Sequence, residues 1–279
     1  MNEYGKLYIV ATPIGNLSDF SPRAIDTLKT VSFIAAEDTR VTGKLLNHFE
    51  IKKHLVSCQK YNEKERTEQI ISKIKEGEDC AFCSDAGTPV ISDPGGLLVS
   101  RALDEGITVI PISGPSAVVT ALSVCGLRCE RFCFEGFLPT PKGGRKKRLE
   151  ELENEKRTIV FYEAPHKLQR TLHDLLNCLG DRKITICREM TKLHEEIWRT
   201  TLNEAAAHYD EIAPKGEFVL VIEGAKEERV EENTLDEAVN KALSMCRNGI
   251  SLSEASKDTA KITGFSKSVI YKAALERKK

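Results

Sequence analysis

Three loops rich in glycine and proline each follow a short apolar run, and their residue types suit a ligand site. They are Thr12-Pro13-Ile14-Gly15-Asn16, Ser84-Asp85-Ala86-Gly87-Thr88-Pro89 and Ser113-Gly114-Pro115-Ser116-Ala117. Gly87 lacks a Cβ, so the backbone beside it can approach a ligand closely, and Asp85 offers a carboxylate acceptor. Because the carboxyl ends of parallel strands meet at one edge of a sheet, we expect the three loops to line one crevice.

Polar residues that follow other apolar runs are the candidates for proton transfer and substrate contact. The segments are Glu37-Asp38-Thr39-Arg40, Glu163 and Arg188-Glu189-Met190-Thr191-Lys192. Carboxylates at the end of a buried strand are costly unless they are engaged. For residues 188–192 we expect contacts to a substrate phosphate or ribose. The first two segments also have a plainer interpretation. Asp38 or Thr39 can cap the next helix with Arg40 paired to Glu37, and Glu163 can bind backbone donors at a helix start.

Several common catalytic and binding motifs are absent from the chain. It has no G-x-G-x-x-G, no G-x-x-x-x-G-K-[ST] and no G-x-S-x-G, which argues against a pyrophosphate clamp and a serine nucleophile. The six histidines lack metal-ligand spacing. Cys80 and Cys83 lie in an expected strand, where positions i and i+3 point to opposite faces. We therefore expect no metal site, and reduced, mostly buried cysteines.

The first 113 residues alternate between short apolar runs and amphipathic segments. We expect strands at residues 7–11, 31–35, 54–58, 81–83 and 107–112, and helices at 21–30, 39–47, 63–76 and 95–105. Strand and helix in alternation indicate a parallel sheet covered on both faces. The sequence thus predicts an N-terminal α/β domain.

The chain then becomes denser in strands. Expected strands are residues 132–137, 158–162, 183–187, 197–201 and 217–222, with helices at 116–124, 144–155, 166–179 and 202–209. This pattern predicts a second α/β domain with a mixed sheet. Charged residues at 225–234 indicate a linker before a small helical unit. The expected boundaries are 1–115, 116–225 and 226–279.

Two basic clusters are candidates for nucleic-acid contact, although the net charge of −1 attracts no polyanion globally. One cluster is Lys142, Arg145, Lys146, Lys147 and Arg148, in what we expect to be a glycine-rich loop. The other is the tail, where residues 252–262, the Gly264 turn and residues 267–275 resemble a helix-turn-helix carrying Lys267 and Lys272. The plainer alternatives are solvated charge and a helical hairpin that only packs on the body.

Composition bounds the class of protein. With 41% hydrophobic and 30% charged residues, the chain is typical of a globular protein. No apolar run approaches the ~20 residues that span a bilayer, and the N-terminus has no signal-peptide pattern. We therefore expect a cytoplasmic protein with no membrane partner.

The loops, in order, resemble the motifs of the tetrapyrrole methylase superfamily, the class III S-adenosylmethionine (SAM) methyltransferases. The resemblance is carried by residues 12–16, 37–40, 84–95, 113–117 and by Phe161-Tyr162-Glu163-Ala164-Pro165-His166, and it covers about residues 5–224. Within the superfamily, these motifs are most similar to the branch that methylates bacterial ribosomal RNA. The tetrapyrrole-making relatives have a Gly-rich acidic loop where this chain has Ser84 to Gly87.

The resemblance implies two α/β domains, a SAM cleft between them, a homodimer, and 2′-O-methylation of a cytidine in 16S ribosomal RNA at the decoding centre. The substrate would be that RNA or the small ribosomal subunit. The implied cofactor residues are Ile14, Gly15, Asp85, Ala86, Gly87, Thr88, Ser116, Ala117, Tyr162, Phe218 and Val219. A ribose hydroxyl must lose its proton, so we expect catalytic roles among Asp38, Arg40, Glu163, Glu189 and Lys192.

Two other functions remain open at this point. One is a methylase of a small tetrapyrrole or of a protein side chain, which would need neither basic cluster. The other is a DNA-binding regulator, which would not need three ligand loops and a two-domain cleft. Labelled SAM, incubated with small ribosomal subunits, separates these possibilities.

Overall fold

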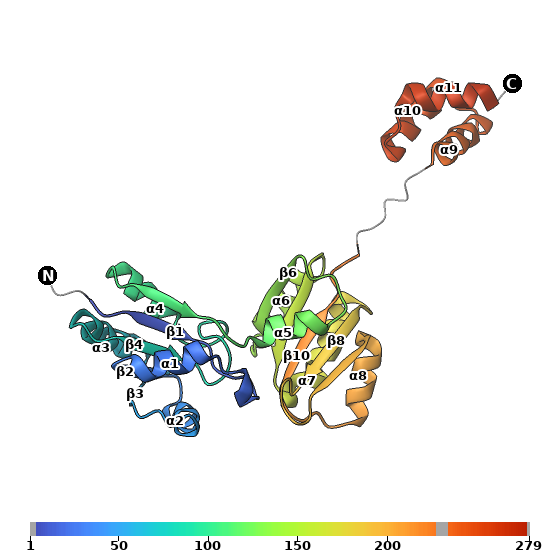
Figure 1. Cartoon of the computed structure of the whole chain (residues 1–279). Helices are drawn as coiled ribbons and strands as arrows, with labels where there is room; N and C mark the ends of the chain where they lie inside the picture. The colour runs from blue at the N-terminus through green and yellow to red at the C-terminus, as the bar shows by residue number, and fades with distance from the viewer. Residues whose placement is uncertain (1–3, 227–233, 278–279) are drawn as a thin grey trace. The chain divides into compact units, whose positions relative to one another are not determined.

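The computed structural model describes residues 4–226 and 234–277, which fall into two compact units that divide between Ala225 and Lys226. The first unit holds two five-stranded sheets, and the described part of the second consists of three helices (Figure 1). Most of the expected linker, residues 227–233, lies outside the described residues.

The N-terminal sheet is parallel throughout, in the strand order β3-β2-β4-β1-β5. Its strands are β1 (Leu7–Val10), β2 (Phe33–Ala36), β3 (His54–Ser57), β4 (Cys80–Cys83) and β5 (Val109–Ile112). The connecting helices are α1 (Pro22–Thr30), α2 (Thr39–His48), α3 (Glu63–Lys75) and α4 (Gly96–Asp104). The parallel sheet predicted from the alternation is confirmed.

Alternate residues of each central strand enter different cores, so this sheet is covered on both faces. Cys80 and Phe82 pack in the core with residues of α3 and α4. Ala81 and Cys83 pack in the opposite core with residues of α1 and α2. Cys80 and Cys83 thus lie on different faces, as strand periodicity requires.

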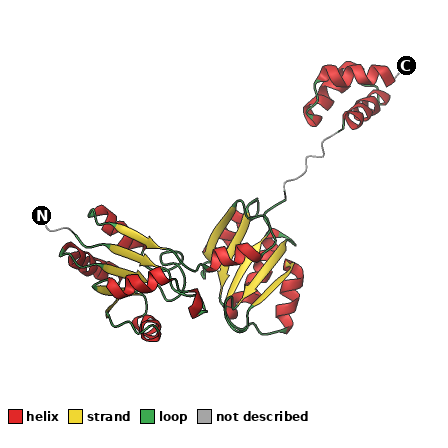
Figure 2. Cartoon of the chain, in the orientation of Figure 1, coloured by secondary structure: helices red, strands yellow, loops and turns green. Residues whose placement is uncertain are grey.

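The second sheet, whose strands are yellow in Figure 2, is mixed. Its order is β6-β7-β10-β8-β9, and only β6 and β7 pair in parallel. Its strands are β6 (Phe132–Phe137), β7 (Thr158–Glu163), β8 (Lys183–Arg188), β9 (Glu196–Thr201) and β10 (Phe218–Ile222). Helix α5 (Ala117–Val124) packs on one face; α6 (Lys142–Leu152), α7 (Pro165–Leu179) and α8 (Leu202–Glu211) pack on the other. The predicted α/β class is confirmed.

The helix expected at residues 144–155 is present as α6, but it begins at Lys142, so the basic cluster lies on a helix and the expected glycine-rich loop is wrong. Leu149 and Leu152 are buried in the core on this face of the sheet, and buried Arg145 pairs with Asp174 of helix α7. Gly143 and Gly144 lie in its first turn, where several backbone N–H groups lack intrahelical partners anyway. Tertiary packing therefore overrides the low helix propensity of glycine.

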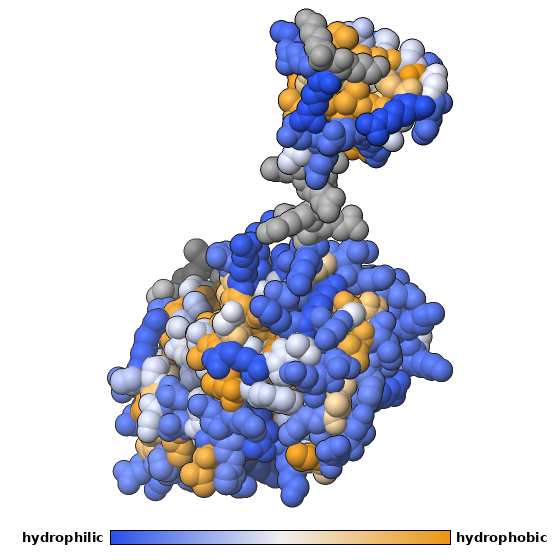
Figure 3. All heavy atoms as spheres, turned by 90° about the vertical axis from the view of Figure 1, so that its right-hand side faces the viewer, coloured by the Kyte–Doolittle hydropathy of each residue, from blue (hydrophilic) through white to orange (hydrophobic). Residues whose placement is uncertain are grey.

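The second unit consists, in its described part, of α9 (Leu235–Arg247), α10 (Leu252–Thr263) and α11 (Lys267–Arg277). Gly264 adopts the left-handed conformation between α10 and α11, so the expected turn is present. Ala238, Ala242, Ala255 and Ile270 form a small core. An apolar area remains visible on the surface of this unit (Figure 3).

Candidate functional site

The three glycine- and proline-rich loops meet at the carboxyl ends of β1, β4 and β5, which are neighbours in the sheet. Thr12 and Gly87 each donate a backbone N–H to the carbonyl of the other, at 2.9 and 3.0 Å. The Thr88 hydroxyl donates to the Pro115 carbonyl at 3.0 Å. The fold therefore brings together three loops that lie up to about a hundred residues apart in the sequence.

A cavity of about 630 Å³ lies beside these loops, and residues of both sheets line it. Such a volume is typical of small-molecule sites, which span roughly 300–1,000 Å³. Its apolar part includes Ile91, Phe137, Tyr162 and Met190. The Tyr162 ring packs edge-on against Phe137, with ring centres 5.7 Å apart, and burial raises the pKa of its hydroxyl to about 12.

The predicted cofactor residues line this cavity with one exception. Those that line it are Ile14, Asp85, Ala86, Gly87, Thr88, Ser116, Ala117, Tyr162, Phe218 and Val219. Gly15 instead lines a second cavity on the other side of its loop. Of the predicted catalytic residues Glu163 lines the first cavity, whereas Asp38, Arg40, Glu189 and Lys192 do not. Cofactor contact by these residues stays a prediction.

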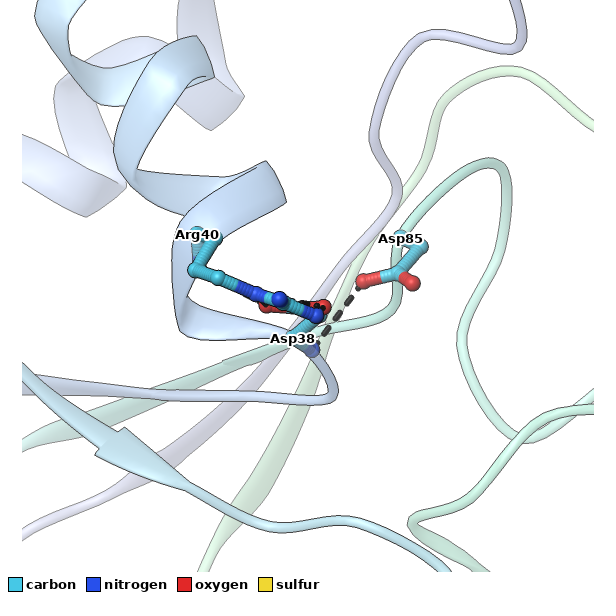
Figure 4. Close-up of polar contacts among 3 residues, drawn as sticks. All are labelled: Asp38, Arg40 and Asp85. Atoms are coloured by element: carbon cyan, nitrogen blue, oxygen red, sulfur yellow. Dashed lines mark hydrogen bonds and ion pairs between the residues drawn. The ribbon is translucent and has the colours of Figure 1, made fainter.

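Asp38 caps helix α2 and holds Arg40, as Figure 4 shows. Its carboxylate accepts the Arg40 backbone N–H at 2.8 Å and pairs with the guanidinium at 2.6 Å, which lowers the pKa of Asp38 to about 2. Arg40 is thus paired with Asp38, not with Glu37. The backbone N–H of Asp38 donates to Asp85 Oδ1 at 3.0 Å, so this turn positions the Asp85 carboxylate.

Glu163 belongs to a buried hydrogen-bond chain that starts on helix α6. Arg145 donates from Nη2 to Thr171 Oγ1 at 2.8 Å, and the Thr171 hydroxyl donates to Glu163 Oε2. The other Glu163 oxygen accepts the Ala164 N–H at 2.8 Å. Because a guanidinium has only donors, the hydroxyl must accept from Arg145 and donate to Glu163. Both carboxylate oxygens of Glu163 are therefore engaged at the helix start.

Arg145 was expected to contact RNA, and its position corrects that expectation. Only 5% of the residue is exposed, and its guanidinium also pairs with Asp174 at 2.6 Å. Arg145 therefore holds helix α6 against helix α7 and is not available to contact RNA phosphates. The other predicted residues of this cluster, Lys142, Lys146, Lys147 and Arg148, are exposed on α6, with Lys146 and Arg148 ion-paired to nearby glutamates.

Glu189 and Lys192 form an ion-pair cluster with Glu217 at the ends of β8 and β10. The Lys192 ammonium lies 2.9 Å from each carboxylate, and it lowers the pKa of Glu189. A Cβ added at Gly15 would lie 2.5 Å from Lys192 Cγ, so the first ligand loop touches this cluster directly. Glu189 has a φ of 49°, a strained conformation that typically occurs at functional sites.

Three carboxylates that line the cavity have raised pKa values. Burial is the main cause for Glu37, Asp85 and Asp93, and repulsion from neighbouring carboxylates adds to it. The pKa of Asp93 reaches about 6. Raised carboxylate pKa values in a cavity are typical of catalytic groups and of sites for cationic ligands.

Asp93 was missed by the sequence analysis, although the motif of residues 84–95 contains it. The available signal was the repeat of Ser84-Asp85 as Ser92-Asp93, followed by Pro94 and Gly95. The sequence does not reveal the backbone conformation of this segment, in which Val90 and Ser92 have φ of 76° and 67°. That strained path carries Asp93 back to the cavity.

The predicted tail residues Lys267 and Lys272 are exposed on α11. Within the described ranges, no group of three His, Cys, Asp or Glu side chains could hold a metal ion. No helix between residues 4 and 226 or between 234 and 277 is long and apolar enough to cross a membrane.

Comparison with known proteins identifies a matching family, similar proteins and a similar solved structure. The family described as Tetrapyrrole (Corrin/Porphyrin) Methylases matches residues 6–206. The chain is 48% identical over 277 residues to "Ribosomal RNA small subunit methyltransferase I" of Synechocystis sp., covering 98% of each protein. The protein of the same name from Halalkalibacterium halodurans is 52% identical over 223 residues, covering 80% of this chain and 77% of that protein. The crystal structure of uroporphyrin-III-C-methyltransferase from Thermus thermophilus has the same fold, with a TM-score of 0.57 at 19% identity over 78% of this chain and 94% of its own.

Replacing Asp93 with Asn should change the pH dependence of stability. With a folded-state pKa of about 6 against an ordinary 3.8, the native state keeps a proton that the unfolded chain has already lost. Parent stability should therefore fall as pH rises from about 4 to 6, and Asp93→Asn should remove this loss. After allowance for solvent screening, we expect a gain of roughly 1 kcal/mol at pH 7.

Urea unfolding of both proteins between pH 4 and 8 measures this difference. Asp104→Asn, on the exposed surface of α4, is the control and should leave the profile unchanged. Parallel profiles for parent and Asp93→Asn would contradict the assignment.

Proposed function

The chain belongs to the tetrapyrrole (corrin/porphyrin) methylase family, and on that premise we propose that it is a SAM-dependent RNA methyltransferase. Its reaction is transfer of a methyl group to the ribose 2′-oxygen of a cytidine in 16S ribosomal RNA, at the decoding centre. The observation that carries the proposal is the 48% identity to a ribosomal RNA small subunit methyltransferase over 98% of both chains.

The cavity fits SAM in size and charge. SAM, when bound, supplies an activated methyl group on a sulfonium. Gly87, at φ 81°, lets the second loop approach a ligand closely, and Ile14 and Phe218 offer apolar contacts. The carboxylates of Glu37, Asp85 and Asp93 give a field that favours a cation.

The residues of the chain contribute mainly position and proton acceptance. Holding two reactants in line can supply several kcal/mol of the barrier, because it converts a bimolecular step into an intramolecular one. The ribose hydroxyl must also lose its proton, and a carboxylate with a pKa of about 6 is a better acceptor than one with a pKa of about 2. We assign proton acceptance to the Glu37–Asp85–Asp93 cluster.

The originally expected catalytic residues then act by positioning. Asp38 and Arg40 hold Asp85 in place, and Glu189 with Lys192 braces the first ligand loop through Gly15. Glu163 fixes the turn from β7 into α7. The exposed faces of Arg40 and Lys192 remain candidates for contacts to RNA phosphates.

The basic surfaces suit an RNA substrate. Exposed lysines lie on α6 and on α11, and each phosphate contact releases counterions. We propose that residues 1–115 and 116–225 form the two catalytic domains and that 226–279 grips the small ribosomal subunit. We further propose a homodimer in the cytoplasm.

The alternatives predict different products. A methylase of a small tetrapyrrole would label neither free RNA nor subunits, and a methylase of a protein side chain would label protein and no RNA. A DNA-binding regulator would label nothing. Incubation with small ribosomal subunits and methyl-labelled SAM, followed by nuclease mapping, identifies the modified nucleotide and its modified atom. Label at a base, or only in protein, would contradict the proposal.

Gly87→Ala should weaken SAM binding at least tenfold by calorimetry. The new Cβ would lie 3.3 Å from Ile14 Cγ2 and would meet the ligand side of the loop, at φ 81°. Gly106→Ala is the control because Gly106 has a φ of 73° but no atom within 4 Å of the added Cβ. Equal SAM affinity in both variants would contradict this placement.

Asp93→Asn should retain subunit affinity and weaken SAM binding, because one carboxylate that favours the cation is lost. At saturating SAM it should lose single-turnover rate by roughly 10²–10⁴-fold, the usual size of a general-base contribution. Asp38→Asn should weaken turnover less, since it disturbs only the Arg40 contact. Rates across pH 5–8 provide the measurement. Parent-like turnover in Asp93→Asn would mean that water takes the proton.

Removal of residues 230–279 should weaken subunit binding by at least tenfold and leave SAM affinity unchanged. The reason is that the tail folds as a separate unit with its own core. Filter binding at several salt concentrations measures both the affinity and the loss of counterion release. A truncated protein that binds subunits like the parent, with the same salt slope, would make the tail structural.

A further inference from the structure

One row of four side chains crosses the second sheet and lines the first cavity. The strand pairings place Phe137 on β6 beside Tyr162 on β7, Tyr162 beside Val219 on β10, and Val219 beside Cys187 on β8. All four residues line the cavity. Their exposed fraction is 1% at Cys187 and 5% at Val219, but 53% at Phe137. The row is therefore buried at its β8 end and open to solvent at its β6 end.

A β-bulge brings Phe137 into this row. The register of β6 against β7 shifts between Phe134 and Gly136, and Gly136 has a φ of 62°. Both Phe134 and Phe137 pack against the Tyr162 ring, with ring centres 4.9 and 5.7 Å apart. Without the extra residue Gly136 would pair with Tyr162, and the open end of the row would lack an aromatic ring. Bulges often redirect a side chain in this way next to a functional site.

The open end of the row lies next to the segment that carries Asp93. A Cβ added at Gly136 would lie 2.8 Å from Ser92 Oγ, so the bulge contacts the residue that precedes Asp93. Burial is the main reason that the pKa of the Tyr162 hydroxyl is raised, and the Asp93 carboxylate adds to it. Phe137 therefore lies close to the proposed proton acceptor.

The two ends of the row suit different molecules. Val219, a predicted cofactor residue, lies two strands away from Phe137, which is about 10 Å at the usual strand spacing. A small cofactor can be enclosed at the buried end. A nucleotide within an RNA chain must keep its phosphates outside, so it can enter only at the open end. The half-exposed ring of Phe137 offers a flat apolar face there, and proteins stack unpaired bases on such faces.

Cations lie near the open end of the row. Helix α6 begins at Lys142, soon after Phe137, and both Lys142 and Lys147 are exposed. The Lys167 ammonium donates to Thr140 Oγ1 at 3.4 Å, so a further cation lies beside the loop that joins β6 to α6. A base stacked on Phe137 would therefore have the flanking phosphates of its chain near groups that bind phosphate.

We propose that Phe137 is the surface on which the base of the acceptor nucleotide stacks, unpaired, with its ribose towards Asp93. The proposal rests on the proposed function, because it places the methyl acceptor in the same cavity as the donor. The cofactor occupies the buried end of the row, near Val219, and the acceptor ribose lies between the two. Stacking is tolerant of base identity, so Phe137 selects an unpaired nucleotide and does not by itself select cytidine.

Substitutions at Phe137 test this stacking surface, and the same strand supplies a matched control. Phe132, at the other end of β6, is 40% exposed and lines neither the first nor the second cavity. Phe137→Leu keeps an apolar side chain but removes the aromatic face, whereas Phe137→Tyr keeps that face. Phe132→Leu makes the same exchange outside the site.

Single-turnover methylation of small ribosomal subunits is measured against subunit concentration at saturating SAM. Phe137→Leu should raise the half-saturating concentration by at least about fivefold, the smallest effect expected of one lost base stack, with SAM affinity by calorimetry unchanged. Phe137→Tyr should recover most of that loss, and Phe132→Leu should match the parent. Parent-like behaviour of Phe137→Leu overturns the proposal. An equally large loss of SAM affinity also overturns it, because the ring would then serve the cofactor.

A photocrosslinking experiment separates this proposal from the proposed function, because it requires no methyl transfer. A short single-stranded RNA with one 5-iodocytidine is irradiated with protein saturated with S-adenosylhomocysteine, and the crosslinked residue is identified by mass spectrometry. A crosslink at Phe137 that is lost in Phe137→Leu, but not in Phe132→Leu, supports the proposal even if the parent protein methylates no subunits. Crosslinks only at other residues, no crosslink, or equal crosslinking of the same RNA in a duplex overturn it, even if subunits are methylated.

Discussion

The paired backbone hydrogen bonds between Thr12 and Gly87 are the contact on which the rest of the site depends. They hold the loops after β1 and β4 together at the edge of the parallel sheet, where the carboxyl ends of the strands converge. Gly87 lines the first cavity and Thr12 lines the second. A parallel sheet produces such an edge whenever neighbouring strands end in loops that can approach closely, and Gly87 allows that approach.

Two groups of carboxylates lie near this edge of the sheet. One group is ion-paired and the other faces the cavity. Asp38 is paired with Arg40, and Glu189 is paired with Lys192, so the pKa values of both carboxylates are lowered. These ion pairs hold the loops in which the carboxylates lie. Glu37, Asp85 and Asp93 face the cavity with raised pKa values. Unpaired, partly buried charge costs stability in the absence of a ligand. A cationic ligand in the cavity relieves that cost, because it neutralises part of the negative charge.

Strained backbone residues and a buried chain of hydrogen-bonded side chains also hold the site in place. Ser92, which lines the cavity, and Glu189 both have left-handed backbone conformations. The chain from Arg145 through Thr171 to Glu163 ties helix α6, which carries exposed lysines, to the turn that lines the cavity. The Arg145 chain links helix α6 to the cavity through fixed hydrogen-bond directions, since a guanidinium can only donate.

The sequence by itself determined the strand–helix alternation, the parallel sheet, the three ligand loops and the family, because local periodicity and glycine or proline positions act over short distances. Tertiary structure alone decided which polar residues reach the cavity. In the sequence Arg145 is one of five basic residues in a cluster, but in the structure it is buried and paired with Asp174. Asp93 reads as a loop residue, yet a strained turn returns it to the site. Whether a side chain points to solvent, a partner or a cavity depends on elements distant in sequence, and no local pattern encodes that.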